Sequence, residues 1–325
     1  MKSAGVPAAS VIIPLYNKAR YIERAIQSVL SQSFPYFELI IVNDGSTDES
    51  VLAVNGIKDP RIILIHQENA GPGAARNKGV QTARGKYVAL LDADDEWLPS
   101  FLHEAVAFLA DHPEASTVSL GYYRSNVFDQ ASSALLDKRK LFEGIYEVDS
   151  SFDPAWCEYL LSYMSPCTTV FRKEVIEKYG GFFDRWKCIC GEDHWLMLKV
   201  LLNQKVAVLR KRLVIIHSEC SELYVNNKIN ALPVVLIEPE GILSSCLEVK
   251  KVIAGRILAC IAIYRAIDCI YFDEVSKARD LLEQFCKEYK PLAYYKACLL
   301  IRLSVQFRPL QNFVRFLCRN SFWRG

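Results

Sequence analysis

Short apolar runs alternate with amphipathic stretches over the first ninety residues of the chain. Runs rich in β-branched residues predict four buried strands at 11–13, 39–42, 61–65 and 87–91. Between the first two, apolar residues recur at the spacing of one helix face: Ile22, Ala25, Ile26, Val29 and Leu30. Further helices are predicted over residues 46–54 and 73–83. Because strands and helices alternate, we expect an α/β fold with a mostly parallel, doubly wound sheet.

The pattern becomes less regular after residue 98. A helix is predicted over residues 99–110, strands over 168–171 and 207–216, a turn over 180–184 and a helix over 192–202. After about Pro239 only helical periodicity remains, with one apolar face made of Val275, Ala278, Leu281, Leu282, Phe285 and Tyr289. We therefore predict a boundary near residue 235, between an α/β domain of residues 1–235 and an all-helical region of residues 236–325.

Composition narrows the class of protein. A 325-residue chain that is 51% hydrophobic and 23% charged is expected to be globular, with one or two domains. The 39 basic and 37 acidic residues nearly cancel, so nucleic acid is not an expected partner. The first ten residues lack the apolar core of a signal peptide, and charges interrupt the most apolar stretch, residues 252–272. We expect a cytoplasmic protein whose eleven cysteines are mostly buried apolar residues.

Acidic residues gather directly after the strand predicted at 87–91, where Asp92, Asp94 and Asp95 follow one another closely. Ligands of doubly wound sheets bind at the carboxyl ends of the strands. Neighbouring carboxylates repel unless they share a cation, and Mg²⁺ commonly takes one or two protein carboxylates and completes its shell with substrate phosphates. The alternative is that Asp95 merely caps the helix near Pro99.

Residues 14–17 follow the first predicted strand and so lie at the same sheet edge, and two further segments lie near predicted strand ends. Asp44 is placed to accept hydrogen bonds from a nucleobase or ribose, although an ordinary Asp-Gly turn is the alternative. Residues 69–77 put glycine and alanine at a helix N-terminus, which favours anions, and Arg76 would add a charge-assisted contact. Neither a Walker A loop nor a GxGxxG pattern is present, so P-loop hydrolases and nicotinamide dehydrogenases are disfavoured.

The second half of the α/β region carries two candidates for chemistry. Glu192 and Asp193 open a predicted helix, either as partners of the helix dipole or as a general base for a hydroxyl group. His217 ends the predicted strand over 207–216 and is either structural or a metal ligand.

Together these residues resemble family 2 of the inverting nucleotide-sugar glycosyltransferases, which have the Rossmann-like GT-A fold. The resemblance runs from residue 11 to about 221 through the blocks VIIPLYNKARYIERAIQSVLSQSFPYFELIIVNDGSTDES, NAGPGAARNKGV, GKYVALLDADDEW, GGFFD, GEDHW and IHSECS. It implies transfer of a hexosyl or N-acetylhexosaminyl group from a nucleoside diphosphate donor, expected to be a UDP-sugar. The acceptor would be a hydroxyl of a glycan or glycolipid, with Mn²⁺ or Mg²⁺ assisting. A nucleotide-sugar half would cover about residues 1–98 and an acceptor half about residues 99–235.

The resemblance also gives roles to residues on the donor side. Pro14, Tyr16 and Asn17 would lie beside the nucleoside, and Asp44 would bind the base. Arg76 falls at the family's basic position near the base and the phosphates. These five residues are therefore the expected nucleotide site.

The remaining assignments concern the metal and the reaction. Asp92 would contact the ribose or the donor sugar, and Asp94, the last acid of the Asp-x-Asp motif, would coordinate the metal. Asp193 matches the catalytic base, with Glu192 supporting it or facing the acceptor. His217 matches a histidine that completes the metal site in some members. A single displacement with Asp193 as base would invert the anomeric centre.

Three features depart from the family pattern. Arg185 stands where an acid usually follows GGFD, the segment 186–190 with Cys188 and Cys190 is unusual, and the last block reads IHSECS in place of the commoner arginine-x-histidine form. No QxxRW sequence is present, so a processive synthase is not expected. Two rivals stay open. A non-catalytic sugar-nucleotide-binding protein would bind the donor without turnover, and a sugar-nucleotide nucleotidyltransferase would be expected to begin with a Gly-rich basic loop.

The last 35 residues contain six basic residues and no acid: Lys296, Arg302, Arg308, Arg315, Arg319 and Arg324. Apolar residues at 310, 313, 314 and 317 share one helix face, as in helices that lie on anionic membranes. We consider two uses for this face: peripheral contact with the inner face of the membrane, or packing on the transferase domain or on a second subunit in a homo-oligomer. A lipid-linked glycan acceptor would fit the first.

Overall fold

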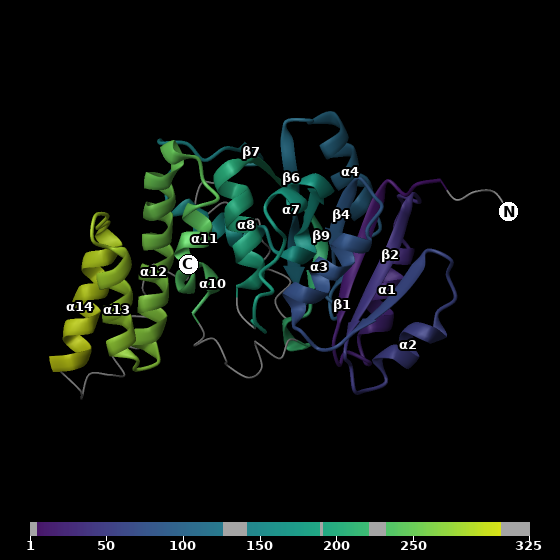
Figure 1. The fold of residues 1–325 in the computed structure, drawn as a ribbon, viewed down its shortest axis with the longest axis horizontal. Coiled ribbons are helices and arrows are strands. Elements are labelled where there is room, and N and C mark those ends of the chain that lie inside the picture. Colours follow the sequence, from purple (N-terminus) through teal and green to yellow (C-terminus); the bar gives the residue numbers. More distant parts are fainter. Residues whose placement is uncertain (1–4, 126–141, 189–190, 221–231, 307–325) are drawn as a thin grey trace.

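The computed structural model describes residues 5–125, 142–188, 191–220 and 232–306. Nine strands of this part of the chain form one sheet in the order β3-β2-β1-β4-β8-β6-β9-β5, with β7 paired to β9 (Figure 1). Their bounds are β1 Ala9–Leu15, β2 Phe37–Asp44, β3 Ile62–Gln67, β4 Tyr87–Leu90, β5 Glu96–Trp97, β6 Ala115–Arg124, β7 Gly144–Tyr146, β8 Thr169–Arg172 and β9 Lys205–Ile216.

The half of the sheet formed by β1 to β4 is parallel, as the alternation of strands and helices predicts. β1 lies between β2 and β4, and β3 extends the sheet beyond β2. The other half is mixed: β8 runs antiparallel to β4 and β6, and β9 is parallel to β6 but antiparallel to β5 and β7. Antiparallel neighbours need no helical crossover, so this half lacks the repeating pattern of the first.

Helices cover both faces of the sheet because successive strand residues point to opposite sides. Val11 and Ile13 point to one face, which we call the first, and pack there with the helices α1 Ile22–Leu30, α2 Ser50–Gly56 and α4 Phe101–Asp111. Ile12 packs with the helices of the second face, α3 Pro72–Thr82, α6 Trp156–Tyr163, α7 Lys173–Lys178 and α8 Glu192–Asn203. A short 3-10 turn, η1 Pro166–Thr168, leads into β8, and another, η2 Ser218–Cys220, follows β9.

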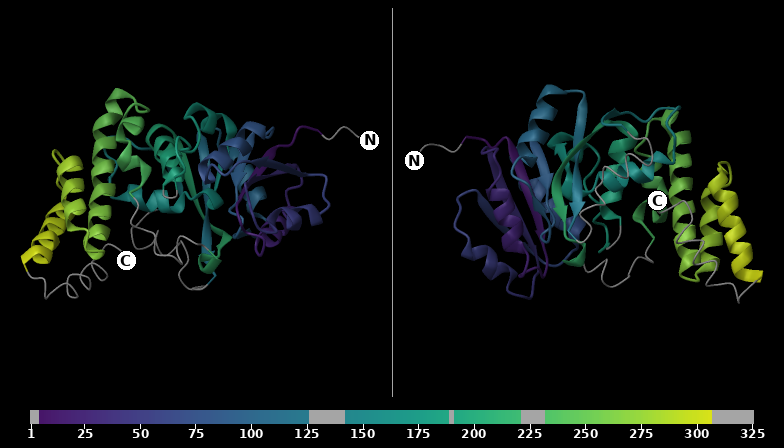
Figure 2. Two further views of the ribbon diagram at one scale, coloured as in Figure 1. Left: turned by 60° about the horizontal axis from the view of Figure 1, so that its bottom comes forward. Right: turned by 180° about the vertical axis from the view of Figure 1, so that it is seen from behind.

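The C-terminal part of the described chain is helical, as predicted. Its elements are α10 Val234–Ile237, α11 Pro239–Leu243, η3 Glu248–Lys250, α12 Lys251–Tyr271, α13 Val275–Phe285 and α14 Leu292–Gln306. Helices α12 to α14 stand at one end of the molecule, and α1 and α2 at the other (Figures 1 and 2). On α13, Ala278, Leu281 and Leu282 are buried, as the apolar face predicts.

The boundary predicted near residue 235 falls within α10. This short helix contacts both α8 and α12, and apolar residues of α12 belong to the same buried cluster as α8. The division into two domains therefore stays a prediction. Within the described ranges, none of the helices combines the length and the apolar character needed to cross a bilayer. The basic residues beyond 306, and Cys190 of the segment 186–190, lie outside the described residues.

Candidate active site

The carboxyl ends of β1, β2 and β4 border a cavity of about 340 Å³. Seven of the ten predicted site residues line it: Pro14, Tyr16, Asp44, Arg76, Asp92, Asp94 and Glu192. The other three, Asn17, Asp193 and His217, lie outside its lining. Residues separated by more than 170 positions thus meet at the sheet edge where the strand-end argument expects a ligand.

Asn17 joins the loops that follow β1 and β2. Its backbone lies in the left-handed region at φ 50°, which asparagine tolerates better than most residues. Its N–H donates to Ser46 Oγ at 3.1 Å, and its side-chain oxygen accepts from Thr47 N at 2.8 Å. The neighbouring Tyr16 is exposed, with Lys187 Nζ 5.9 Å from its ring centre. Asn17 thus fixes the loop that presents Tyr16 to the cavity.

Asp44 uses both carboxylate oxygens to hold one wall of the cavity. Oδ1 accepts from Gln67 Nε2 and from Ala70 N, each at 2.8 Å, and Oδ2 accepts from Gly71 N at 2.9 Å. The side chain is buried, and Gly71 adopts φ 94°, which few residues other than glycine tolerate. The contact with a nucleobase that the resemblance gives to Asp44 stays a prediction.

Arg76 forms ion pairs with two acidic residues on different sides of the cavity, Asp92 and Glu192. Its Nη2 donates to Asp92 Oδ1 at 2.9 Å and its Nη1 to Glu192 Oε1 at 2.7 Å. Burial lowers the pKa of Arg76, but the charges of Asp92 and Glu192 outweigh it and hold the pKa above its usual value. Burial, followed by the charge of Asp193, raises the pKa of Glu192, and Arg76 opposes this rise. Arg76 therefore links Asp92, in the loop after β4, to helix α8.

Asp94 is paired with Lys18. Lys18 Nζ lies 2.8 Å from Asp94 Oδ2, while Arg24 donates to the backbone carbonyl of Asp94 at 2.5 Å. Burial and the charge of Asp92 raise the pKa of Asp94, and Lys18 partly offsets the rise. The loop after β4 is thus held at its backbone and at its acidic side chain.

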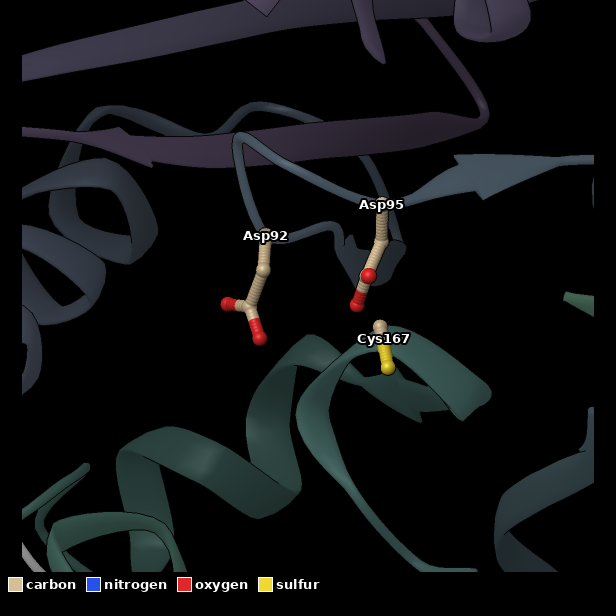
Figure 3. A group of neighbouring side chains, drawn as sticks. All are labelled: Asp92, Asp95 and Cys167. Carbon is tan, nitrogen blue, oxygen red and sulfur yellow. The ribbon is translucent and has the colours of Figure 1, made fainter. Parts of the chain in front are cut away.

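Asp92 and Asp95 lie near Cys167, a residue of η1 (Figure 3). One possible ligand atom from each lies within 4.8 Å of the others. Asp95 does not act as the helix cap considered above, because its Oδ1 accepts from His217 N at 2.9 Å. Burial and the charges of Asp92 and Asp94 raise the pKa of Asp95 well above its usual range. Concentrated carboxylates of this kind suit a hard divalent cation such as Mg²⁺ or Mn²⁺.

His217 lies beside this cluster with both ring nitrogens near carboxylates. Nε2 is 2.8 Å from Glu96 Oε1, and Nδ1 is 3.1 Å from Glu219 Oε1. A metal ligand needs one free nitrogen lone pair, so coordination would require one of these contacts to break. His217 as a metal ligand stays a prediction.

A turn tied to α3 places α8 beside the cavity. Asn77 donates from Nδ2 to Phe182 O and to Asp184 Oδ2, both at 2.8 Å, and its Oδ1 accepts from Phe182 N. A Cβ on Gly73 would lie 2.0 Å from Phe183 O, so only glycine permits this approach. The residues of the GGFFD block therefore also fix how this turn packs against α3.

Helix α8 begins at Glu192, and Asp193 follows on its first turn. The residue before it, Gly191, has φ 79°, a left-handed conformation that starts the helix abruptly. Asp193 Oδ1 accepts from His194 N at 2.8 Å, and its charge is close enough to affect Arg76 and Glu192. Arg185 forms an ion pair with Glu238 and lies 4.9 Å from the Phe183 ring centre. Arg185 thus connects the turn to the C-terminal helices.

Several residues around the cavity were not predicted. Lys187 lines it, Lys18 forms an ion pair with Asp94 of the Asp-x-Asp motif, and Cys167 lies beside Asp92 and Asp95. Lys18 directly follows Asn17, so a wider definition of the strand-end segment would have included it. For Cys167 the sequence offers no signal, because its neighbour Asp95 is 72 positions away.

The sequence matches the family model described as Glycosyl transferase family 2 over residues 10–180. It is similar to glycosyltransferase GlyA of Streptococcus pneumoniae, with 31% identity over 216 residues, which make up 63% of this chain and 30% of GlyA. The chain therefore matches less than a third of that relative's length.

Solved structures resemble the whole chain. Residues 1–349 of S. aureus TarS in complex with UDP-GlcNAc superpose with a TM-score of 0.67 at 21% identity, covering 98% of this chain and 92% of that fragment. The mannosyltransferase PcManGT of Pyrobaculum calidifontis, in complex with GDP-Man and Mn²⁺, gives a TM-score of 0.54 at 18% identity, covering 98% of this chain and 88% of that one. The fold is thus a GT-A-like α/β sheet with C-terminal helices.

Proposed function

The chain belongs to glycosyltransferase family 2, and from this premise we propose that it transfers a sugar from a UDP-sugar to a hydroxyl group of a glycan, with inversion. The observation that carries the proposal is the cavity, where Asp92 of the Asp-x-Asp motif and Glu192 on the first turn of α8 are joined through Arg76. The UDP-GlcNAc complex of TarS supports a uridine donor. Both hexosyl and N-acetylhexosaminyl transfer are compatible with these residues.

We further propose that Asp94 holds a divalent cation, Mn²⁺ or Mg²⁺, beside Asp92. The cavity supplies carboxylate oxygens, the ligands that hard divalent cations prefer. Burial and the charge of Asp92 raise the pKa of Asp94, so a positive charge is needed to hold both carboxylates in their ionised form. The PcManGT complex with GDP-Man and Mn²⁺ supports this choice of cation. Such a cation, when bound, stabilises the negative charge that grows on the departing diphosphate.

The chain's own residues then divide the remaining work. Asp193 removes the proton from the acceptor hydroxyl as its oxygen attacks the anomeric carbon. Glu192, held by Arg76 at 2.7 Å, fixes the turn of α8 that carries Asp193. Attack from the face opposite the diphosphate replaces one bond by another in a single step, so the configuration inverts. The walls formed by Asp44 and residues 69–71 keep the donor in place.

An Asp94→Ala substitution is expected to abolish metal-dependent donor binding. We expect a panel of nucleotide sugars, measured by calorimetry with Mn²⁺, to contain one that binds the wild type at least about tenfold more tightly with the metal than without it. In Asp94→Ala this metal dependence disappears, because the carboxylate that anchors the cation is gone. Glu104→Ala, which removes a surface acid paired with Lys211, is the control and keeps wild-type binding. Equal metal dependence in wild type and Asp94→Ala would contradict the proposal.

The two rival functions give different products in the same assay. A non-catalytic binding protein would bind the donor but release no sugar or diphosphate. A nucleotidyltransferase would release pyrophosphate from a nucleoside triphosphate and sugar phosphate. The proposed transferase releases nucleoside diphosphate only, at a rate that rises when a hydroxyl acceptor is added.

We also propose that the cytoplasmic face of an anionic membrane is the partner of helix α14. Three apolar residues on one side of this helix are exposed: Leu292 by 72%, Tyr295 by 58% and Leu299 by 56%. Exposed Lys296 and Arg302 flank them, and the segment from 291 to 325 contains cations but no acid. Apolar residues bordered by positive charge match an anionic lipid surface, which would bring the active site to a lipid-linked glycan.

Replacing Leu292, Tyr295 and Leu299 together by Gln is expected to lower sedimentation with phosphatidylglycerol vesicles at least about fivefold, because the apolar area that enters the interface is lost. Val249→Gln/Val252→Gln, which removes exposed apolar residues before and at the start of α12, is the matched control and sediments like the wild type. Unchanged sedimentation of the triple variant would contradict membrane contact. A wild-type dimer that the triple variant loses would assign this face to a second copy instead.

A further inference from the structure

Lys18 already places a positive charge where the proposed cation would bind. Its ammonium lies 2.8 Å from Asp94 Oδ2, and the two side chains are only 17% and 13% exposed. Lys18 also lines the cavity. The ammonium donates a further hydrogen bond to Cys220 O at 3.0 Å, so it connects the Asp-x-Asp loop to the segment after β9.

The position of Lys18 is built into the fold. Its backbone N–H donates to Ser50 Oγ at 2.9 Å, and Ser50 is in turn held by Asp48, whose Oδ1 accepts from Ser50 N at 3.0 Å. The preceding residue, Asn17, is fixed between the two loops by Ser46 and Thr47. The start of the side chain is therefore held firmly, whereas its four methylene groups are flexible, so the ammonium can change partners without any movement of the backbone.

Each acid of the Asp-x-Asp motif forms an ion pair with a basic side chain of the cavity. Asp92 is paired with Arg76, and Asp94 with Lys18, so both acids of the Asp-x-Asp motif already have a positive partner. Arg76 is buried and is also bonded to Glu192, so releasing it would leave two carboxylates without their partner. Lys18 pairs with Asp94 at the end of a flexible stem, and its side chain is 17% exposed, against 6% for Arg76. Of these two cations, Lys18 is the one that can leave.

We propose that Lys18 is the internal counter-ion of Asp94 and that a divalent cation binds only by displacing its ammonium. Lys18 thereby weakens metal binding in the donor-free protein and ties occupation of the metal site to the arrival of the donor. Once displaced, the ammonium stays within reach of a diphosphate in the cavity, where a lysine binds as a point charge. This inference rests on the proposed role of Asp94 as the metal ligand.

The test measures Mn²⁺ affinity of the donor-free protein by the electron paramagnetic resonance signal of free Mn²⁺. Lys18→Met is expected to bind Mn²⁺ about tenfold more tightly than the wild type, since the competing charge is removed. Lys18→Gln, which keeps a hydrogen-bond donor for Cys220 O, is expected to tighten binding similarly. Circular dichroism checks that each variant is folded, and an increase of the melting temperature on adding Mn²⁺ serves as a second readout.

Lys187→Met is the matched control, because it removes the same charge from the cavity lining at a residue that lies by the Tyr16 ring. Its Mn²⁺ affinity is expected to stay within about twofold of the wild type, since Asp94 and Asp92 pair with Lys18 and Arg76 and the exposed charge of Lys187 is screened by solvent. Asp94→Asn is expected to abolish binding with or without Lys18. Unchanged affinity in Lys18→Met, with binding lost in Asp94→Asn, would overturn the role of Lys18 and leave the metal site standing. Unchanged affinity in Asp94→Asn would overturn the metal site itself, and the inference with it.

Discussion

Replacing Asp193 by Asn is expected to lower the turnover number roughly a thousandfold, the scale of a lost general base. Asn has nearly the same shape but cannot accept the proton of the acceptor hydroxyl. Donor affinity should stay within about twofold, because Asp193 lies outside the lining of the cavity where the donor is proposed to bind. The measurement is steady-state transfer to the acceptor, together with donor binding by calorimetry.

Asp184→Asn is the matched control for this prediction. Asp184 is an exposed acid of the turn before α8 and accepts a hydrogen bond from Asn77 at 2.8 Å. Its amide variant is expected to keep transfer within a few-fold of the wild type. If Asp193→Asn retained more than about a tenth of the activity, Asp193 would not be the base. Glu192 would not simply replace it, since its carboxylate is engaged by Arg76.

Replacing Arg76 by Met is expected to lower the free energy of unfolding by about 3 kcal/mol near neutral pH. Arg76 is buried and is the partner of both Asp92 and Glu192. Without it Glu192 is a buried carboxylate with no guanidinium to balance its charge. Urea denaturation followed by circular dichroism measures the loss.

The loss should depend on pH in a defined direction. The pKa of Glu192 in the folded protein is already raised by burial and by Asp193, and Arg76 opposes the rise. Removing Arg76 raises that pKa further, so the folded variant binds a proton more strongly than the unfolded chain does. Protonation therefore stabilises the folded variant at low pH, and this gain disappears as the pH rises through the raised pKa. The destabilisation should be larger at about pH 8 than at about pH 5.

A double variant provides the control for Arg76. Glu192→Gln in the Arg76→Met background removes the unpaired charge and is expected to recover about half of the lost stability. The free energy of unfolding of this double variant should also change less with pH than that of Arg76→Met alone. If the single Arg76→Met variant were as stable as the wild type at every pH, the ion pairs of Arg76 with Asp92 and Glu192 would not stabilise the fold, and the prediction would be wrong.

The parts of the fold that sequence predicts are those whose contacts are local. The buried face of α1 and the buried strands of the parallel half each correspond to a short pattern of apolar residues in the sequence, and the structure contains both. Strand β6, Ala115–Arg124, was missed because it has no continuous apolar run. Its buried Ser119 bonds Thr169 Oγ1 on β8 at 2.8 Å, so polar residues are satisfied across the sheet. A partner fifty positions away leaves no trace in a local pattern.

The site divides in the same way. The strand-end rule predicted that Pro14, Asp44, Asp92 and Asp94 would come together, and all four line one cavity. It could not predict how they are paired. The contact of Arg76 with Glu192 joins residues 116 positions apart, and the contact of Lys18 with Asp94 joins residues 76 apart. Sequence therefore indicates which residues meet, and the structure adds which charges neutralise one another.

The central claim is that this cavity carries out a single displacement with Asp193 as the base. The most direct test is the anomeric configuration of the first-formed product, read from the proton coupling constants by NMR during transfer from an α-linked UDP-sugar. The account predicts a β-linked product, with no α-linked product at early times. A product that retains the α configuration would require two displacements or attack from the same face, and would contradict the account.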